Sequence, residues 1–453
     1  MSDHHKTPTL IDAIIPIIVL IIMLSFSVYL YGDNSSYGAN QIALILSASI
    51  AAIIAIKNGY SWKEVESGIV KGIGMGMRAI LILLAVGALI GTLIMSGTVP
   101  AMIFYGLDIL SPSFFYFTAC IICAISSISI GSSWTVAGTL GVALMGIATG
   151  LGLSPSVTAG AIISGAYFGD KMSPLSDTTN LAPAIAGTDL FSHIRHMAWT
   201  TGPSLLIALV IFLIMGLNSS AEGNAEGLEL IQSTLNKTFN ISIISFIPII
   251  VIFVLAYKKM PAFPTILIGA LLAGLFSILL QPEVVSNLVN QPGLSSGLTM
   301  ISGVWTALHS GFVLESGVPV VDNLLTRGGM ASMLNTIWLV VCALTFGAVL
   351  ETAQLLHKIV EKVLIFANST GSLIVTTIAT CIGINIIAAD QYIAIVLPGR
   401  MYRAEFKRRK LAARNLSRAL EDSGTITSPL IPWNTCGAYM SACLLYTSDA
   451  ADE

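Results

Sequence analysis

Long apolar runs are the feature that most constrains the fold of this chain. Nine runs approach or exceed the roughly 18 residues that a helix needs to span a bilayer. Every backbone polar group inside lipid must be bonded internally, so such runs fold as helices. We therefore expect an all-α polytopic membrane protein with about 10–12 transmembrane segments, because shorter runs broken by glycine and proline add to the nine. The nine runs lie at 10–31, 41–56, 79–96, 101–125, 199–217, 239–257, 262–280, 333–351 and 371–397.

The composition supports this class and gives no sign of a soluble domain. Hydrophobic residues occupy 55% of the 453 positions and charged residues only 10%, whereas soluble proteins average about 25% charged. Membrane lipid is therefore the expected surrounding, and no nucleic-acid partner is expected. All six cysteines lie in apolar stretches, which predicts packed thiols and not a disulfide framework.

The placement of basic residues predicts the topology. Lysine and arginine flank the connection at 57–78, whereas the acidic segment at 218–238 has a single lysine and the 400–418 connector is densely basic. Because cytoplasmic loops are enriched in lysine and arginine, we expect the N-terminus and both basic segments on the cytoplasmic side of the cell membrane. The acidic segment is then external.

The order of features along the chain predicts two repeats. We expect an N-terminal transmembrane helix at 1–38, a first transmembrane repeat at 39–217, the acidic external loop at 218–238 and a second repeat at 239–445. Each repeat carries acidic residues and a Ser-Pro-Leu tripeptide inside a broken apolar segment, which is typical of transporters. The polar tail at 446–453 cuts off the last apolar segment, so we expect it to be non-native.

A polar stretch at 169–183 interrupts the apolar sequence of the first repeat. Asp170 and Asp177 are ionisable groups at expected membrane depth, and such groups mark ion or substrate paths. Carboxylate, hydroxyl, amide and carbonyl oxygens suit a hard cation, and Pro174 frees backbone groups from helix bonding. The alternative is an aqueous loop with a helix cap. The expected supporting ligands here are Ser173, Ser176, Thr178, Thr179 and Asn180.

Asp390 is the most isolated acid of the apolar sequence, with Asn385 five residues before it. A carboxylate that holds either a proton or a metal cation, but not both, links the two fluxes in a proton-coupled carrier. The alternative is a structural acid paired with Asn385, Gln391 or a lysine.

A third polar group follows the basic connector. Ser428, Asn434 and Thr435 are candidate ligands, and Pro429 and Pro432 break the helix around them. Glu421 and Asp422 have two readings, either part of this group or the cytoplasmic end of the connector. Ser132, Ser133 and Thr135 are either polar ligands or small residues for close helix packing.

These motifs resemble the NhaC-type sodium/proton antiporter family of the ion transporter superfamily. The matching elements are 131–141, 165–180, 385–392 and 428–435, and the Gly-Asp-Lys-Met-Ser-Pro-Leu-Ser-Asp-Thr-Thr-Asn run that ends at Asn180 is the most specific. The resemblance implies two inverted repeats, each with a re-entrant hairpin and a discontinuous helix that meet at midmembrane. It also implies a secondary transporter and not an enzyme, which exchanges Na⁺ for H⁺ by alternating access and serves pH homeostasis.

Several functional alternatives stay open at this point. Relatives in the superfamily similar to malate/lactate antiporters couple Na⁺ and H⁺ to small organic acids, and an intramembrane protease or a channel would be a different class. We expect Na⁺ at Asp177 and Asp390, proton binding shared among Asp170, Asp177 and Asp390, and no cofactor beyond the transported ions. A homodimer is a further expectation left open.

Overall fold

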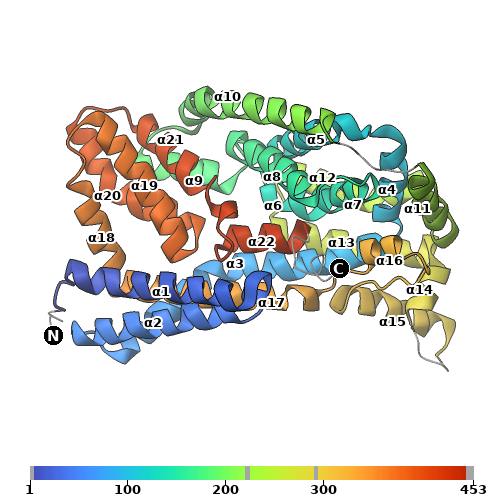
Figure 1. The fold of residues 1–453 in the computed structure, drawn as a ribbon, viewed down its shortest axis with the longest axis horizontal. Helices are drawn as coiled ribbons and strands as arrows, with labels where there is room; N and C mark the ends of the chain where they lie inside the picture. The colour runs from blue at the N-terminus through green and yellow to red at the C-terminus, as the bar shows by residue number, and fades with distance from the viewer. Residues whose placement is uncertain (1–4, 220–224, 290–293, 445–453) are drawn as a thin grey trace.

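The regular structure of the chain is helical (Figure 1). The computed structural model describes residues 5–219, 225–289 and 294–444, and within them the only β pairing is one isolated bridge between Phe312 and Arg327. Nine of the described helices are long and apolar enough to cross a membrane, or ten if the bent pair at 227–257 is one span. The expected all-α polytopic class is confirmed. The tail at 446–453 lies outside the described residues.

The nine apolar helices, or ten with the bent pair, compare with the expected 10–12 segments. The number is low because two further helices of sufficient length are too polar to be counted. α8 (Pro155–Met172) and α20 (Gln391–Arg408) each have 18 residues, yet neither is among the nine. α8 carries Asp170 and Lys171 near its end, and α20 ends in the basic connector. Both helices carry or adjoin a predicted site residue, since Asp170 lies in α8 and Asp390 directly precedes α20.

The long apolar helices form the frame of the molecule. Figure 1 shows α1, α2 and α17 side by side along one edge, and α10 along the opposite edge. Only 11% of the apolar window of α10 is buried, as expected for a helix that faces lipid. The frame helices are α1 (Leu10–Tyr31), α2 (Ala39–Lys57), α3 (Trp62–Met95), α10 (Leu190–Leu217), α13 (Ala262–Leu280) and α17 (Leu334–Thr352).

Side-chain caps fix where several of these helices begin. The Thr9 hydroxyl accepts the Asp12 N–H at 3.1 Å and the Asp12 carboxylate accepts the Thr9 N–H, which is a capping box at the start of α1. Ser61 and Glu64 form the same arrangement at the start of α3. α3 then packs against α13, α17 and α2, so the 34-residue helix is the central element of the frame.

Shorter helices connect the frame. They lie between the long helices and at their ends, and several begin with proline, which is tolerated in the first turn. They are α4 (Thr98–Ile109), α11 (Ala225–Thr238), α12 (Ile247–Tyr257), α14 (Pro282–Leu288), α15 (Ser296–His309), α16 (Pro319–Leu325) and α18 (Leu355–Leu364).

A first set of helices, which we call the first broken unit, covers residues 115–186. In it α5 and α8 run parallel, because the Tyr116 hydroxyl accepts the Ser154 N–H at the start of both helices and the Ser127 hydroxyl donates to the Ala166 carbonyl near their ends. Glycines allow this close packing, since a Cβ at Gly165 would lie 2.1 Å from the Cys120 carbonyl oxygen. The unit contains α5 (Phe115–Ile130), α6 (Ser133–Val136), a π-helical turn (Ala137–Gly141), α7 (Val142–Gly150), α8 and α9 (Asp177–Ala186).

A second broken unit covers residues 370–444 and has the same order. α19 and α20 form an antiparallel hairpin, in which the Thr380 and Tyr402 hydroxyls lie 2.8 Å apart. α21 runs parallel to α19, since the Asn385 amide near the end of α19 donates to the Gly424 carbonyl at the end of α21 at 2.6 Å. The unit contains α19 (Thr370–Ala388), α20, α21 (Ala413–Gly424), a 3₁₀ turn (Ser428–Leu430) and α22 (Thr435–Leu444).

All six cysteines are buried and free. The prediction of packed thiols without a disulfide framework is confirmed.

Candidate ion-binding site

The hairpin turn of the first broken unit lies against Asp170. Gly131 ends α5 in the left-handed conformation (φ 76°), and Ser132 then caps the next helix by accepting the Thr135 N–H at 3.2 Å. This turn directs Ser133 toward α8. Its hydroxyl and its N–H donate to Asp170 Oδ2 at 2.6 and 3.3 Å. The turn therefore supplies the donors that hold the Asp170 carboxylate.

The break between α8 and α9 is held by hydroxyl groups. Ser176 caps α9 by accepting the Thr179 N–H. The Thr179 hydroxyl in turn donates to the carbonyl oxygens of Asp170 and Lys171 at 2.9 and 3.0 Å. Those carbonyls belong to the last turn of α8, where the regular helical partners run out, and the Asp170 carbonyl also accepts the Ser173 N–H at 3.4 Å. The interrupted helix thus places carbonyl and hydroxyl oxygens next to a carboxylate.

The second broken unit repeats this backbone geometry. Ala389 ends α19 in the left-handed conformation (φ 55°), and Asp390 follows in an extended conformation (φ −144°), as Ser132 does after Gly131 (φ −150°). The Asp390 carboxylate caps α20 by accepting the Ile393 N–H at 3.0 Å. Asp390 is only 8% exposed, so the most isolated acid of the sequence lies in the core at a hairpin turn.

Two asparagines join this turn to the break after α21. The Asn434 amide donates to Asn385 Oδ1 at 3.2 Å, and the Asn385 amide donates to the Thr427 hydroxyl at 2.9 Å. The Thr435 N–H donates to the Ala389 carbonyl at 3.0 Å. The predicted ligands Asn385 and Asn434 are therefore in direct contact, although 49 positions separate them along the chain.

Ser428 lies at the edge of the same cluster. Its hydroxyl is 3.4 Å from Gln391 Oε1 and donates to the Thr425 carbonyl at 2.7 Å. The second break thus offers a carboxylate, side-chain amides, hydroxyls and backbone carbonyls, which are the ligands that suit a hard cation.

The two broken units touch each other. The rings of Trp134, at the first hairpin turn, and Tyr439, on α22, stack with centroids 4.0 Å apart, and the Tyr439 hydroxyl donates to the Trp134 carbonyl at 2.7 Å. Tyr392 lies within electrostatic reach of Asp177, Asp390 and Asp170. The buried carboxylates of Asp170 and Asp390 therefore lie near the contact of the two units, with Asp177 at the edge of the same region.

Asp177 lies apart from these contacts. Its carboxylate is 66% exposed and pairs with Arg78 of α3 at 3.2 Å. Asn180 is also exposed and bonds the carbonyls of Pro174 and Ser176. By contrast, the other predicted ligands of this stretch are buried, namely Ser173, Ser176, Thr178 and Thr179.

Three charged residues of the region were not among the predicted ligands. Lys171 Nζ lies 2.6 Å from Asp422 Oδ1, and the Thr200 hydroxyl donates a hydrogen bond to Asp422 Oδ2 at 2.9 Å. Glu421, for which the sequence left two interpretations open, is fully buried. Ser417 and Thr425 lie one helical turn before and after it on the same face and are fully buried too, so small hydroxyl residues at this spacing were the sequence feature that could have indicated its burial.

No group of three or more histidine, cysteine, aspartate or glutamate side chains suited to a metal ion occurs in the described part of the chain.

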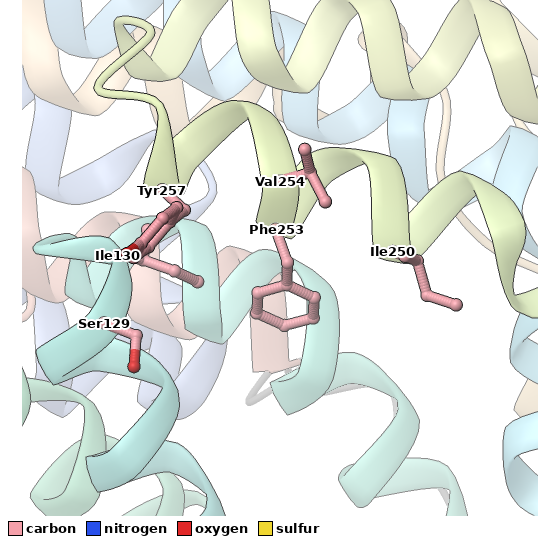
Figure 2. Close-up of a pocket in the computed structure, with 6 residues that line it drawn as sticks. All are labelled: Ser129, Ile130, Ile250, Phe253, Val254 and Tyr257. Carbon is pink, nitrogen blue, oxygen red and sulfur yellow. The ribbon is translucent and has the colours of Figure 1, made fainter.

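Two clefts border the region, and neither contains the carboxylates. One of about 320 Å³ lies between the end of α5 and α12 and is almost wholly apolar, lined by Ile130, Phe253 and Tyr257 among others (Figure 2). The other, of about 300 Å³, lies between α8, α10 and the second break, with Tyr167 and Pro429 in its lining. The second cleft also has hydroxyl groups in its lining, from Ser164, Thr201 and Ser204.

The model of the Na⁺/H⁺ antiporter family matches residues 165–449, which include both helix breaks. The chain is 38% identical over 404 residues to the Na⁺/H⁺ antiporter NhaC of Alkalihalophilus pseudofirmus, covering 89% of this chain and 84% of that protein.

Two other relatives are named for different substrates. The chain is 36% identical to the malate-2H⁺/Na⁺-lactate antiporter of Bacillus subtilis, over 97% of this chain and 90% of that protein. It is 35% identical to the arginine/ornithine antiporter ArcD of Halobacterium salinarum, over 98% of this chain and 88% of that protein. The predicted resemblance to NhaC-type antiporters is confirmed, and the chain belongs to the Na⁺/H⁺ antiporter family.

Proposed function

We propose that this chain is a secondary antiporter that exchanges Na⁺ for H⁺ across the cytoplasmic membrane by alternating access. One observation carries the proposal. In each broken unit a hairpin turn contacts a helix break beside a buried carboxylate, Asp170 in the first unit and Asp390 in the second. Irregular backbone at membrane depth is tolerated where it lines a cavity or lies buried in protein, and broken helices of this kind hold ions in transporters.

The proposed site uses the carboxylates of Asp170, Asp177 and Asp390. Na⁺ is assigned to Asp390 and Asp177, and a proton competes with Na⁺ for the same carboxylates. Asp177 is exposed and paired with Arg78, so we place it at the outer end of the ion path, which we call its mouth. Asp170 and Asp390 bind the ions deeper in the protein, where the two units meet. The neutral ligands are Ser173, Ser176, Thr178, Thr179, Asn180, Asn385, Ser428, Asn434 and Thr435.

Helix directions support an inverted relation between the two broken units. α21 runs parallel to α10, because His193 bonds Ser417 and Thr200 bonds Asp422 further along both helices. α10 follows α9 after a short turn at 187–189 and packs against α8. Gly160, early in α8, lies near Phe212, late in α10, whereas Lys171 at the end of α8 shares Asp422 with Thr200, so α8 and α10 run antiparallel. Corresponding helices α8 and α21 therefore run in opposite directions, as two repeats of opposite membrane orientation require.

The charges near the breaks favour an inorganic cation over an organic acid. The basic residues at the first break, Lys171 and Arg78, are already paired with Asp422 and Asp177. A substrate carboxylate would have to displace one of those partners to bind there. The alternative, Na⁺- and H⁺-coupled exchange of malate and lactate, rests on the Bacillus subtilis relative.

The test is a measurement of internal pH in proteoliposomes that carry the full chain. NaCl alone is expected to drive proton movement. Sodium malate opposed by lactate, and arginine opposed by ornithine, are applied separately as the competing substrates. A response seen only with one of those organic pairs would refute Na⁺/H⁺ exchange as the function.

A further inference from the structure

The second cleft, between α8, α10 and the second helix break, is lined by two buried hydroxyl groups that make no hydrogen bond in the described part of the chain. They belong to Tyr167 on α8, which is 2% exposed, and to Thr201 on α10, which is 7% exposed. Ser204, one turn further along α10, instead donates to the Thr200 carbonyl at 2.8 Å. The hydroxyls of Tyr167 and Thr201 therefore remain available to whatever enters the cleft.

The inner end of this cleft reaches the ligands of the second break. The Tyr167 hydroxyl lies beside the Ser428 hydroxyl without forming a hydrogen bond to it. Pro429, the residue after Ser428, belongs to the lining. Ser428 in turn lies 3.4 Å from Gln391 Oε1, and Gln391 directly follows Asp390. A chain of neighbouring polar groups therefore leads from the cleft to the second buried carboxylate.

The lining suits water and a hydrated cation better than a lipid tail. The cleft has a volume of about 300 Å³, and a water molecule takes about 30 Å³ in the liquid, so several water molecules fit. An acyl chain in the same place would leave both buried hydroxyls unpaired, which costs free energy. The described lining contains no charged side chain, so an organic carboxylate would find no cation there, whereas hydroxyl oxygens are ligands that a hard cation accepts.

We propose that the second cleft is a hydrated chamber through which Na⁺ reaches and leaves the second break, and that the Tyr167 hydroxyl binds the ion at its inner end. The inference rests on the proposed function and deepens it. Neither Asp177 nor Arg78 is among the described residues that line the cleft, so this route is separate from the mouth of the path. Alternating access requires a route to the site from each side of the membrane, and the cleft supplies one besides the mouth.

The first test removes one oxygen atom from the inner end of the cleft. In proteoliposomes that carry the full chain, Tyr167→Phe is expected to raise the Na⁺ concentration for half-maximal exchange several-fold, because the ion loses a ligand. The maximal rate is expected to stay near wild type. An unchanged Na⁺ dependence in folded Tyr167→Phe would overturn the inference.

Tyr116→Phe is the matched control for this variant. It removes the same oxygen near the start of α5, where the Tyr116 hydroxyl accepts the Ser154 N–H at 3.0 Å and does not line the cleft. Its Na⁺ dependence is expected to stay near wild type. An equal shift in Tyr116→Phe and Tyr167→Phe would assign the effect to helix packing and would also overturn the inference.

The second test asks what fills the cleft. Ser204→Cys places a thiol in its wall, and Leu206→Cys places one on the same helix, outside the lining, where the side chain is 65% exposed. Membranes that carry each full-length variant are treated with a charged methanethiosulfonate, which reacts with the thiolate form of cysteine, and the modified peptide is identified by mass spectrometry. Wild type treated in parallel gives the background from the six buried cysteines.

Labelling of Ser204→Cys and not of Leu206→Cys is expected, because a thiol ionises in water and not in lipid. If Ser204→Cys does not fold, Ser164→Cys probes the α8 side of the same cleft. Labelling by a lipophilic maleimide alone would place a lipid tail in the cleft and overturn the inference. Labelling does not depend on transport. A wild type that moves neither ion would therefore refute the proposed function, while the labelling still decides whether the cleft holds water.

Discussion

Lys171 Nζ and Asp422 Oδ1 lie 2.6 Å apart and join α8 to α21 across 251 positions of the sequence. The lysine side chain is 4% exposed and the aspartate side chain 24%. The pair therefore ties the two broken units together at the first helix break. It also occupies a basic side chain that lies next to Asp170 in the sequence and within electrostatic reach of Glu421.

Replacing Lys171 by methionine is expected to lower the free energy of unfolding by about 3 kcal/mol, because removal of one partner leaves a largely buried charge uncompensated. Thermal unfolding in detergent measures the loss. In the double variant Lys171→Met/Asp422→Leu much of the stability is expected to return, since apolar replacement of both partners removes the unpaired charge. A double variant as unstable as Lys171→Met would show that the pair is not the cause.

Replacing Asp390 by asparagine is expected to abolish Na⁺-driven proton movement and leave the fold intact. Asparagine caps a helix about as well as aspartate, so α20 keeps its first turn while the titratable group is lost. Asp390→Ala loses the cap as well and is expected to cost about 1 kcal/mol more in stability. Proton flux in proteoliposomes and thermal unfolding separate the two effects. Undiminished flux in Asp390→Asn would remove this carboxylate from the mechanism.

The sequence predicted the parts of the site that depend on local context. Asp390 has apolar residues on both sides, and the Ser-Pro-Leu segments break their helices, so both features are legible along a short stretch of chain. The partners of Asp170 and Lys171 are different, because Ser133 and Asp422 reach them from 37 and 251 positions away. Such pairs depend on how helices pack, which the order of residues does not reveal. Asp177 and its neighbour Thr178 differ in exposure for the same reason.

Replacing Gly131 by alanine is expected to slow exchange and to destabilise the protein by about 1 kcal/mol or more. The residue has φ 76°, and a Cβ there would lie 2.6 Å from the Leu175 Cβ and 2.9 Å from the Ser176 nitrogen. The hairpin turn must then move away from the first helix break. Exchange rate and thermal unfolding are the two measurements.

Ala389→Gly is the matched control in the second unit. Glycine removes a left-handed strain of about 1–2 kcal/mol and loses a buried methyl group worth about 0.8 kcal/mol, so little change in stability is expected at this position (φ 55°). If Gly131→Ala were equally harmless, close contact between turn and break would not matter for transport.

Replacing Asp177 by asparagine is expected to change stability by less than about 1 kcal/mol, because its ion pair with Arg78 is exposed on both sides. If Asp177 contacts Na⁺ at the mouth of the path, the same variant raises the Na⁺ concentration for half-maximal exchange several-fold. Arg78→Gln breaks the same ion pair and keeps the carboxylate, so its Na⁺ dependence is expected to stay near wild type. An equal shift in both variants would assign the effect to the ion pair and leave Asp177 without a direct part in ion binding.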